Sequence, residues 1–216
     1  MAASTTGEQA STGGLSASEN APVLTTPIEA LSELMAGNRR FVAGRPRYGH
    51  VVSNAAAVAS GTQTPYAVVL GCIDSRVPLE AVFDQNFGSM CVVRSGGHAL
   101  DRAVLGSVQF AVAELKVPLV VVLGHERCGA VAATVAALRT GREPGGALAF
   151  LVDEIAPAVH EAGLLAPDVH TRAVRLHVRN TVGRLSELAT AAGSAGPVNV
   201  VGAVYDLDTS RVELLR

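Results

Sequence analysis

Three side chains that commonly bind transition metals stand in two short motifs. The stretch "GHERCG" (124–129) places His125 and Cys128 three residues apart, and "GCIDSR" (71–76) supplies Cys72. Two thiolates and one imidazole suit zinc, and three protein ligands leave a fourth tetrahedral position open for water. The alternative is that these cysteines simply fill the core, where small thiols are common. We predict one Zn²⁺ per chain in an open, catalytic type of site.

Asp74 and Arg76 lie two and four residues beyond Cys72. Because two thiolates offset the charge of Zn²⁺, a water bound there is acidified less than at a site with neutral ligands. Neighbouring groups must then help to hold this water as hydroxide at neutral pH. Asp74 can accept a hydrogen bond from zinc-bound hydroxide, and Arg76 can pair with Asp74 bidentately and keep it ionised. An ordinary loop salt bridge is the alternative interpretation of this pair.

Apolar runs that alternate with helical patterns must position these motifs. The expected strands are 66–71, 90–94, 119–124 and 199–207, with 210–215 folded back on the last as a hairpin. Helices are expected at about 101–115, 128–140, 145–163 and 168–192. This alternation predicts an α/β fold with a mainly parallel sheet and helices on both faces. Since ligands gather at the carboxyl ends of such strands, Cys72 and His125 converge if their strands are neighbours.

The ends of the chain differ in composition. Residues 1–24 are rich in Ala, Ser, Thr and Gly, which predicts a disordered tail. Thr26-Pro27-Ile28-Glu29 has the capping-box pattern with proline at the first helical position, so an N-terminal helical arm is expected to begin there. The remainder, 25–216, is predicted to form a single catalytic domain, because a chain of 216 residues that is 49% hydrophobic supports one sizeable core.

Charge and cysteine content exclude several classes of partner. A net charge of −2 gives no electrostatic basis for binding nucleic acid or an anionic membrane. No apolar run approaches the ~20 residues that span a bilayer. Three cysteines without a signal peptide indicate reduced thiols, and therefore a cytoplasmic protein.

The paired motifs "CIDSR" and "HERCG" closely resemble those of the β-class carbonic anhydrases, which carry C-x-D-x-R and H-x-x-C-G. Further similar stretches are "AGNRRFVAG" (36–44), "VVRSGGH" (92–98) and "LGSVQFAVAELKV" (105–117). The resemblance implies reversible hydration of CO₂ to bicarbonate and a proton, by zinc-bound hydroxide. It also implies a mainly parallel α/β sheet and a homodimer or a higher assembly of dimers.

The resemblance assigns roles to individual residues. Cys72, His125 and Cys128 are the implied zinc ligands, and Asp74 with Arg76 is the implied catalytic dyad. In some members the matching aspartate becomes the fourth zinc ligand in a closed state, so Asp74 is also a ligand candidate.

Further positions are expected to contact the substrate. Gln63 matches a glutamine that reaches the site from the neighbouring subunit, although a solvent-facing loop amide is the alternative. Phe110 and Cys91 stand where aromatic residues often wall the CO₂ pocket. Gly129, at a helix N-terminus, would let the backbone approach the anionic product.

One segment departs from the family pattern, and two other functions stay open. The family's R-N-x-A-N reads "RSGGH" (94–98), and His98 is interpreted as a structural or interface residue in preference to a proton shuttle. A hydrolase of CS₂ or COS could use the same fold and ligands. A non-catalytic zinc protein or thiol redox sensor could use Cys72 and Cys128, but it would have no need of Asp74 and Arg76.

Overall fold

The structure is a computed structural model, and the part of the chain that it describes is residues 24–48, 63–142, 144–191, 196 and 198–216. The predicted tail, residues 1–24, lies outside these ranges apart from Leu24. Among the helices in the described ranges, none is long and apolar enough to cross a membrane.

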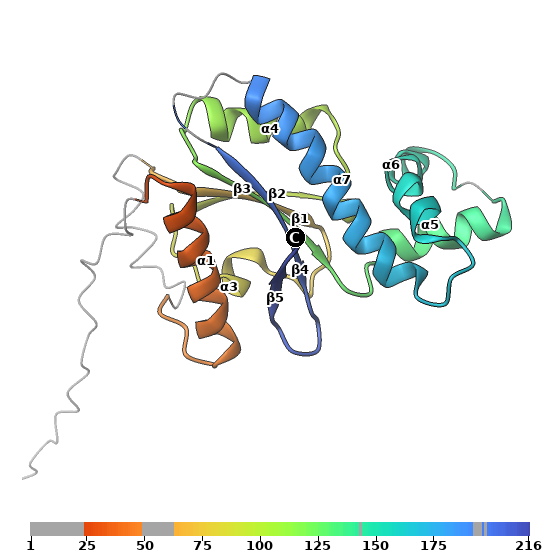
Figure 1. The fold of residues 1–216 in the computed structure, drawn as a ribbon, viewed down its shortest axis with the longest axis horizontal. Helices are drawn as coiled ribbons and strands as arrows, with labels where there is room; N and C mark the ends of the chain where they lie inside the picture. Colours follow the sequence, from red (N-terminus) through yellow and green to blue (C-terminus); the bar gives the residue numbers. More distant parts are fainter. Residues whose placement is uncertain (1–23, 49–62, 143, 192–195, 197) are drawn as a thin grey trace, which may run out of the picture.

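Five strands form one sheet in the order β2-β1-β3-β4-β5 (Figure 1). Their bounds are β1 Ala67–Cys72, β2 Met90–Ser95, β3 Leu119–His125, β4 Asn199–Tyr205 and β5 Val212–Leu214. The first four pair in parallel, and β5 pairs with β4 antiparallel. The mainly parallel sheet and the hairpin at its end are therefore confirmed.

Helices cover both faces of this sheet, as predicted, because its central strands are apolar on both sides. In β1, Val68 and Leu70 belong to one core cluster, whereas Ala67 and Val69 belong to the other. Helices α1 and α3 lie over one face, α4 and α7 over the other, and α5 and α6 gather against one half of α7 (Figure 1). The helix bounds are α1 Pro27–Val42, α3 Leu79–Val82, α4 Arg102–Ala113, α5 Gly129–Thr140, α6 Ala147–Ala162 and α7 Val169–Ala191.

Helix α1 begins at the predicted capping box. The backbone N–H of Glu29 donates to Thr26 Oγ1 at 3.3 Å, and Thr26 Oγ1 donates to Glu29 Oε2 at 2.7 Å. Further along, the buried amide of Asn38 donates to the carbonyl oxygens of Val82 and Ser210, both at 3.0 Å, and accepts from the N–H of Val212 at 2.9 Å. These bonds hold α1 against α3 and the β4–β5 hairpin, since an unpaired buried amide would be unfavourable.

Two short elements were not predicted from the sequence. One is α3, whose four residues are too few to show a helical period. The other is the 3₁₀-helix η1, Gly96–His98, whose Gly-Gly start has the composition of a loop. Because η1 directly follows β2, it lies beside the carboxyl end of β1, where the first metal-ligand candidate stands.

Candidate metal centre

Three metal-ligand candidates meet at one edge of the sheet. Cys72 is the last residue of β1, and His125 is the last residue of the adjacent parallel strand β3. Cys128 follows as the N-cap of α5. All three are buried, and their ligand atoms lie within 4.8 Å of one another. The structure thus brings together the residues that the sequence analysis selected for zinc.

The chain around these ligands is shaped by close packing. A Cβ on Gly124, just before His125, would lie 2.6 Å from Val178 Cγ2, so glycine lets α7 approach β3 at this point. On the other side, Arg94 Nε donates to the Cys72 carbonyl at 2.8 Å, and Arg94 Nη2 donates to the Asp74 carbonyl at 2.6 Å. Arg94 therefore fixes the loop that leaves β1.

The protonation of His125 fits a metal ligand. Its Nδ1 lies 2.9 Å from the Glu126 carbonyl oxygen, which can only accept a hydrogen bond, so Nδ1 carries the proton. The Nε2 atom is then left with a lone pair, and within the described part of the chain it is buried without a hydrogen-bond partner. A neutral imidazole oriented through its other nitrogen is the usual state of a metal-binding histidine.

The thiol of Cys72 also fits a soft divalent cation. Hydrogen bonding with the Cys128 side chain and, less strongly, with the N–H of Gly97 lowers the pKa of the Cys72 thiol, although burial opposes this effect. The Gly97 N–H donates to Cys72 Sγ at 3.3 Å. A lowered pKa favours the thiolate, which is the form that binds metal. This donor set suits zinc.

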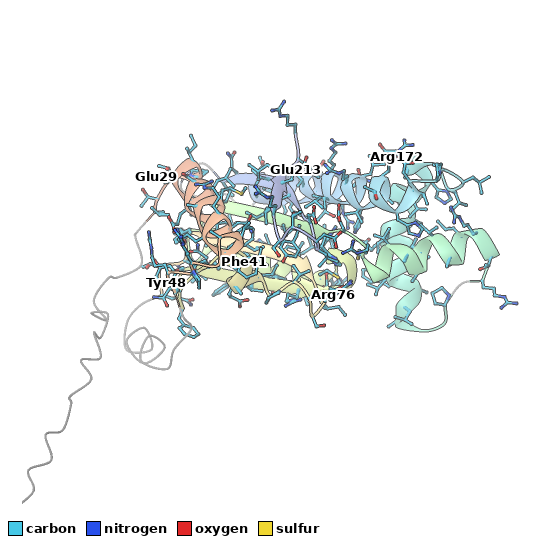
Figure 2. All side chains as sticks on the ribbon, turned by 90° about the horizontal axis from the view of Figure 1, so that it is seen from below. Glu29, Phe41, Tyr48, Arg76, Arg172 and Glu213 are labelled. Atoms are coloured by element: carbon cyan, nitrogen blue, oxygen red, sulfur yellow. The ribbon has the colours of Figure 1, made fainter. Side chains whose placement is uncertain are left out.

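Asp74 and Arg76 form a bidentate pair at the rim of the cluster. Arg76 Nε donates to Asp74 Oδ1 at 2.9 Å, and Arg76 Nη2 donates to Asp74 Oδ2 at 2.7 Å. These bonds hold the pKa of Asp74 well below its usual range, although partial burial opposes them. Asp74 Oδ2 lies 3.9 Å from His125 Nε2, so an ionised carboxylate borders the metal ligands. The guanidinium of Arg76 reaches the surface (Figure 2).

Gly129 is the one substrate candidate that adjoins this cluster. It is the first residue of α5, next to Cys128, and a Cβ there would meet no atom within 4 Å. The space beside this helix N-terminus is open to a small anion.

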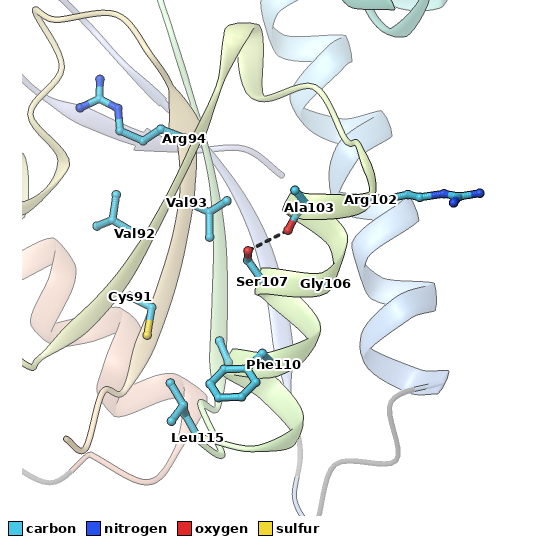
Figure 3. Close-up of a pocket in the computed structure, with 11 residues that line it drawn as sticks. Cys91, Val92, Val93, Arg94, Arg102, Ala103, Gly106, Ser107, Phe110 and Leu115 are labelled. Atoms are coloured by element: carbon cyan, nitrogen blue, oxygen red, sulfur yellow. Dashed lines mark hydrogen bonds between the residues drawn. The ribbon is translucent and has the colours of Figure 1, made fainter. Parts of the chain in front are cut away.

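Two other substrate candidates lie away from the metal ligands in the same chain. Gln63 is exposed and precedes the start of β1, whereas Cys72 ends that strand, about 20 Å further on. Phe110, which is 56% exposed, lines a pocket of about 690 Å³ between β2 and α4. Figure 3 shows Cys91 and Phe110 toward one end of this pocket and Arg94 toward the other. Cys91 pairs with Val68, four residues before Cys72.

Some contacts of the centre involve residues to which the sequence analysis gave no role. Arg94 was noted only within a family-like segment, and His177 carried no signal, as one histidine in the 23-residue helix α7. His98 is buried and stacks on His177, with 4.5 Å between ring centroids. A buried, stacked imidazole agrees with a structural role for His98.

Comparison with known proteins identifies the family. Residues 67–212 match the carbonic anhydrase family. Carbonic anhydrase 2 of Mycobacterium tuberculosis is 44% identical over 197 residues, which cover 88% of this chain and 93% of that protein. The chain therefore belongs to the carbonic anhydrase family and is an enzyme with the α/β fold described above.

Solved structures with the same fold define the class within that family. The β-carbonic anhydrase of Coccomyxa, solved in complex with acetazolamide, has a TM-score of 0.66 and 27% identity, with 86% of both chains covered. Tetrameric β-carbonic anhydrases of Sordaria macrospora give a TM-score of 0.63 at 24% identity, covering 87% of this chain and 95% of that chain. The β-class resemblance of "CIDSR" and "HERCG" is thus confirmed.

Proposed function

We propose that the protein binds one Zn²⁺ per chain through Cys72, His125 and Cys128 and catalyses the reversible hydration of CO₂ to bicarbonate and a proton. The observation that carries this proposal is the buried Nε2 of His125, which has no hydrogen-bond partner among the described residues and lies close to two cysteines and an ionised carboxylate. The activity named for the M. tuberculosis relative supports it.

The bound metal would supply an acidified water as the nucleophile at neutral pH. Asp74 accepts a hydrogen bond from the attacking water and so directs a lone pair toward CO₂. Arg76 keeps Asp74 ionised and fixes the plane of the Asp74 carboxylate through two side-chain hydrogen bonds. The N-terminus of α5 at Gly129 favours the negative charge that develops on the product. The released proton passes to buffer.

Asp74 would have a second role in a closed state. If its carboxylate left Arg76 and joined the metal ligands, it would displace the attacking water. The pairing of Asp74 with Arg76, at 2.7 Å between Nη2 and Oδ2, supports an open state in which Asp74 is not a metal ligand. Closure requires the loss of both side-chain hydrogen bonds.

We further propose that the working unit is a dimer or an assembly of dimers. Gln63 and Phe110 lie away from the metal ligands of their own chain, so a substrate role for either requires the site of a neighbouring subunit. The edge strand β2 is half-buried along its whole length, which leaves it available for contact with a second copy. The three free cysteines fit a reducing compartment such as the cytoplasm.

The test combines metal analysis with rapid kinetics on one purified sample. Elemental analysis should find one zinc per chain, and stopped-flow measurement with a pH indicator should detect CO₂ hydration that disappears when zinc is removed and returns when it is restored. Zinc binding with turnover of COS or CS₂ but not of CO₂ would favour the hydrolase alternative. Absence of zinc, with reversible oxidation of Cys72 and Cys128, would favour a redox sensor.

A further inference from the structure

A buried histidine lies directly behind one of the proposed zinc ligands. His177 belongs to α7 and is 2% exposed. Its Nε2 lies 2.9 Å from the carbonyl oxygen of Gly97. Because a carbonyl oxygen can only accept, the Nε2 of His177 carries a proton and donates it to this hydrogen bond. Burial lowers the pKa of His177, so the ring is neutral and donates through this one nitrogen.

Gly97 connects His177 to the metal centre. The N–H of Gly97 donates to Cys72 Sγ at 3.3 Å, while its carbonyl accepts from His177. Gly97 has a left-handed conformation, with φ of 57°, and a Cβ there would lie 2.9 Å from Ile155 Cδ1 and 3.0 Å from Ala130 Cβ. Glycine is thus favoured here, and since glycine has the freest backbone, an external contact helps to fix the direction of its N–H.

The hydrogen bond to Cys72 matters because of the charge of the ligand set. Two thiolates neutralise a divalent zinc ion, which weakens the ion as a Lewis acid. An N–H that donates to a thiolate withdraws electron density from the sulfur, and hydrogen bonds to sulfur are a recognised means of tuning metal centres. The metal retains more of its positive charge if the Gly97 N–H stays in line with Cys72.

We infer that His177 is a positioning residue of the metal centre: by holding the Gly97 carbonyl, it keeps the Gly97 N–H directed at the Cys72 thiolate. The inference rests on the zinc site proposed above and extends it to a residue that neither binds metal nor touches substrate. His98 stacks on the His177 ring at 4.5 Å and 19° and fixes its plane. These two hydrogen bonds link α7 to the end of β1: His177 is 80 residues from Gly97 in the sequence, and Gly97 is 25 residues from Cys72.

The experiment compares four substitutions in the full chain. His177→Leu removes the donor, and His177→Gln keeps an N–H at a similar reach. His177→Asn is equally polar but one methylene shorter, so it should fail to reach Gly97. His170→Leu is the matched control, because His170 is an exposed histidine of the same helix.

Two measurements that do not depend on turnover report on the metal centre. The first is the zinc dissociation constant, from competition with a chelator. The second is the sulfur-to-metal charge-transfer absorption of the cobalt-substituted protein. We expect His177→Leu and His177→Asn to weaken zinc binding by about 10- to 100-fold, the usual range for such supporting contacts. Their absorption band should move to longer wavelength, since a thiolate without its hydrogen bond is easier to oxidise. His177→Gln and His170→Leu should match the unchanged protein.

Several outcomes would overturn the inference. Unchanged zinc affinity and absorption in His177→Leu would mean that the contact does not act on Cys72. Equal impairment of His177→Gln and His177→Asn would mean that the ring serves only to fill space. If the leucine variant fails to fold, the glutamine–asparagine pair still decides the question. If the unchanged protein fails to bind zinc, the proposed function and this inference are both overturned. If it binds zinc normally and the His177 variants bind zinc as tightly, only the inference is overturned.

Discussion

Replacing Asp74 with asparagine tests the proposed role of the carboxylate with the smallest change in shape. Arg76 donates to Oδ1 from its backbone N and from Nε, both at 2.9 Å, and to Oδ2 from Nη2 at 2.7 Å. An asparagine that keeps the two bonds at Oδ1 puts an NH₂ group in place of Oδ2, the atom 3.9 Å from His125 Nε2. The side of the residue that faces the metal ligands then presents a donor instead of an acceptor.

The expected loss is large in activity and small in stability. Removing one preorganised electrostatic partner typically lowers kcat by about 10²–10³, equivalent to about 2.7–4 kcal/mol of barrier. The Asp74–Arg76 pair contributes little to the free energy of unfolding, because the arginine is 53% exposed and such pairs are screened by solvent. Zinc content should also be retained, since Asp74 is not a ligand in the open state. Stopped-flow CO₂ hydration, elemental analysis and thermal melting measure the three quantities.

The matched control is Asp208→Asn. Asp208 accepts two hydrogen bonds from Arg127, both at 2.8 Å, but it is 69% exposed and stands outside the Cys-His-Cys cluster. This variant should keep full activity. If Asp74→Asn hydrates CO₂ at the unchanged rate, or if Asp208→Asn loses as much, the pair of Asp74 and Arg76 is an ordinary loop salt bridge and the proposed orientation of water is wrong.

Four further outcomes are expected. Cys128→Ser should lose both zinc and activity, and full zinc occupancy by elemental analysis would contradict the ligand assignment. Light scattering should find at least a dimer, because Gln63 is expected to serve a neighbour's site; a fully active monomer would refute this. Activity should rise from about pH 6.5 to about pH 8.5. X-ray absorption at both pH values should show whether the carboxylate of Asp74 binds zinc at low pH. If the zinc coordination is the same at both, simple titration of the bound water is the cause of the pH dependence. Burial lowers the pKa of His98 and His177, so below about pH 6.5 the unfolded chain binds more protons than the folded one. The free energy of unfolding should therefore fall as the pH falls, by up to about 1.4 kcal/mol per pH unit for each ring. In urea titrations of the metal-free protein, the free energy of unfolding of His177→Gln should fall less steeply with pH.

The sequence by itself determined the fold class and selected the three side chains that the structure brings together as metal-ligand candidates. Continuous apolar runs identified the buried parallel strands, because in this chain they are separated by helical patterns and bounded by glycine. Parallel neighbours end at the same edge of a sheet, so the positions of Cys72 and His125 just after two such runs were enough to place them together. The side-chain pairing of Asp74 with Arg76 was also accessible, since two residues in one loop need no distant contact to meet.

Only the tertiary structure decided what supports those ligands and which candidates reach them. The hydrogen bonds that link His177, Gly97 and Cys72 join residues 80 and 25 positions apart, and no periodic pattern records such contacts. Whether a helical histidine faces a sheet or the solvent depends on how the whole helix is rotated and packed, which the close approach of α7 at Gly124 fixes here. Likewise, Gln63 precedes a strand that Cys72 ends, and about 20 Å of extended backbone keeps the two apart within one chain.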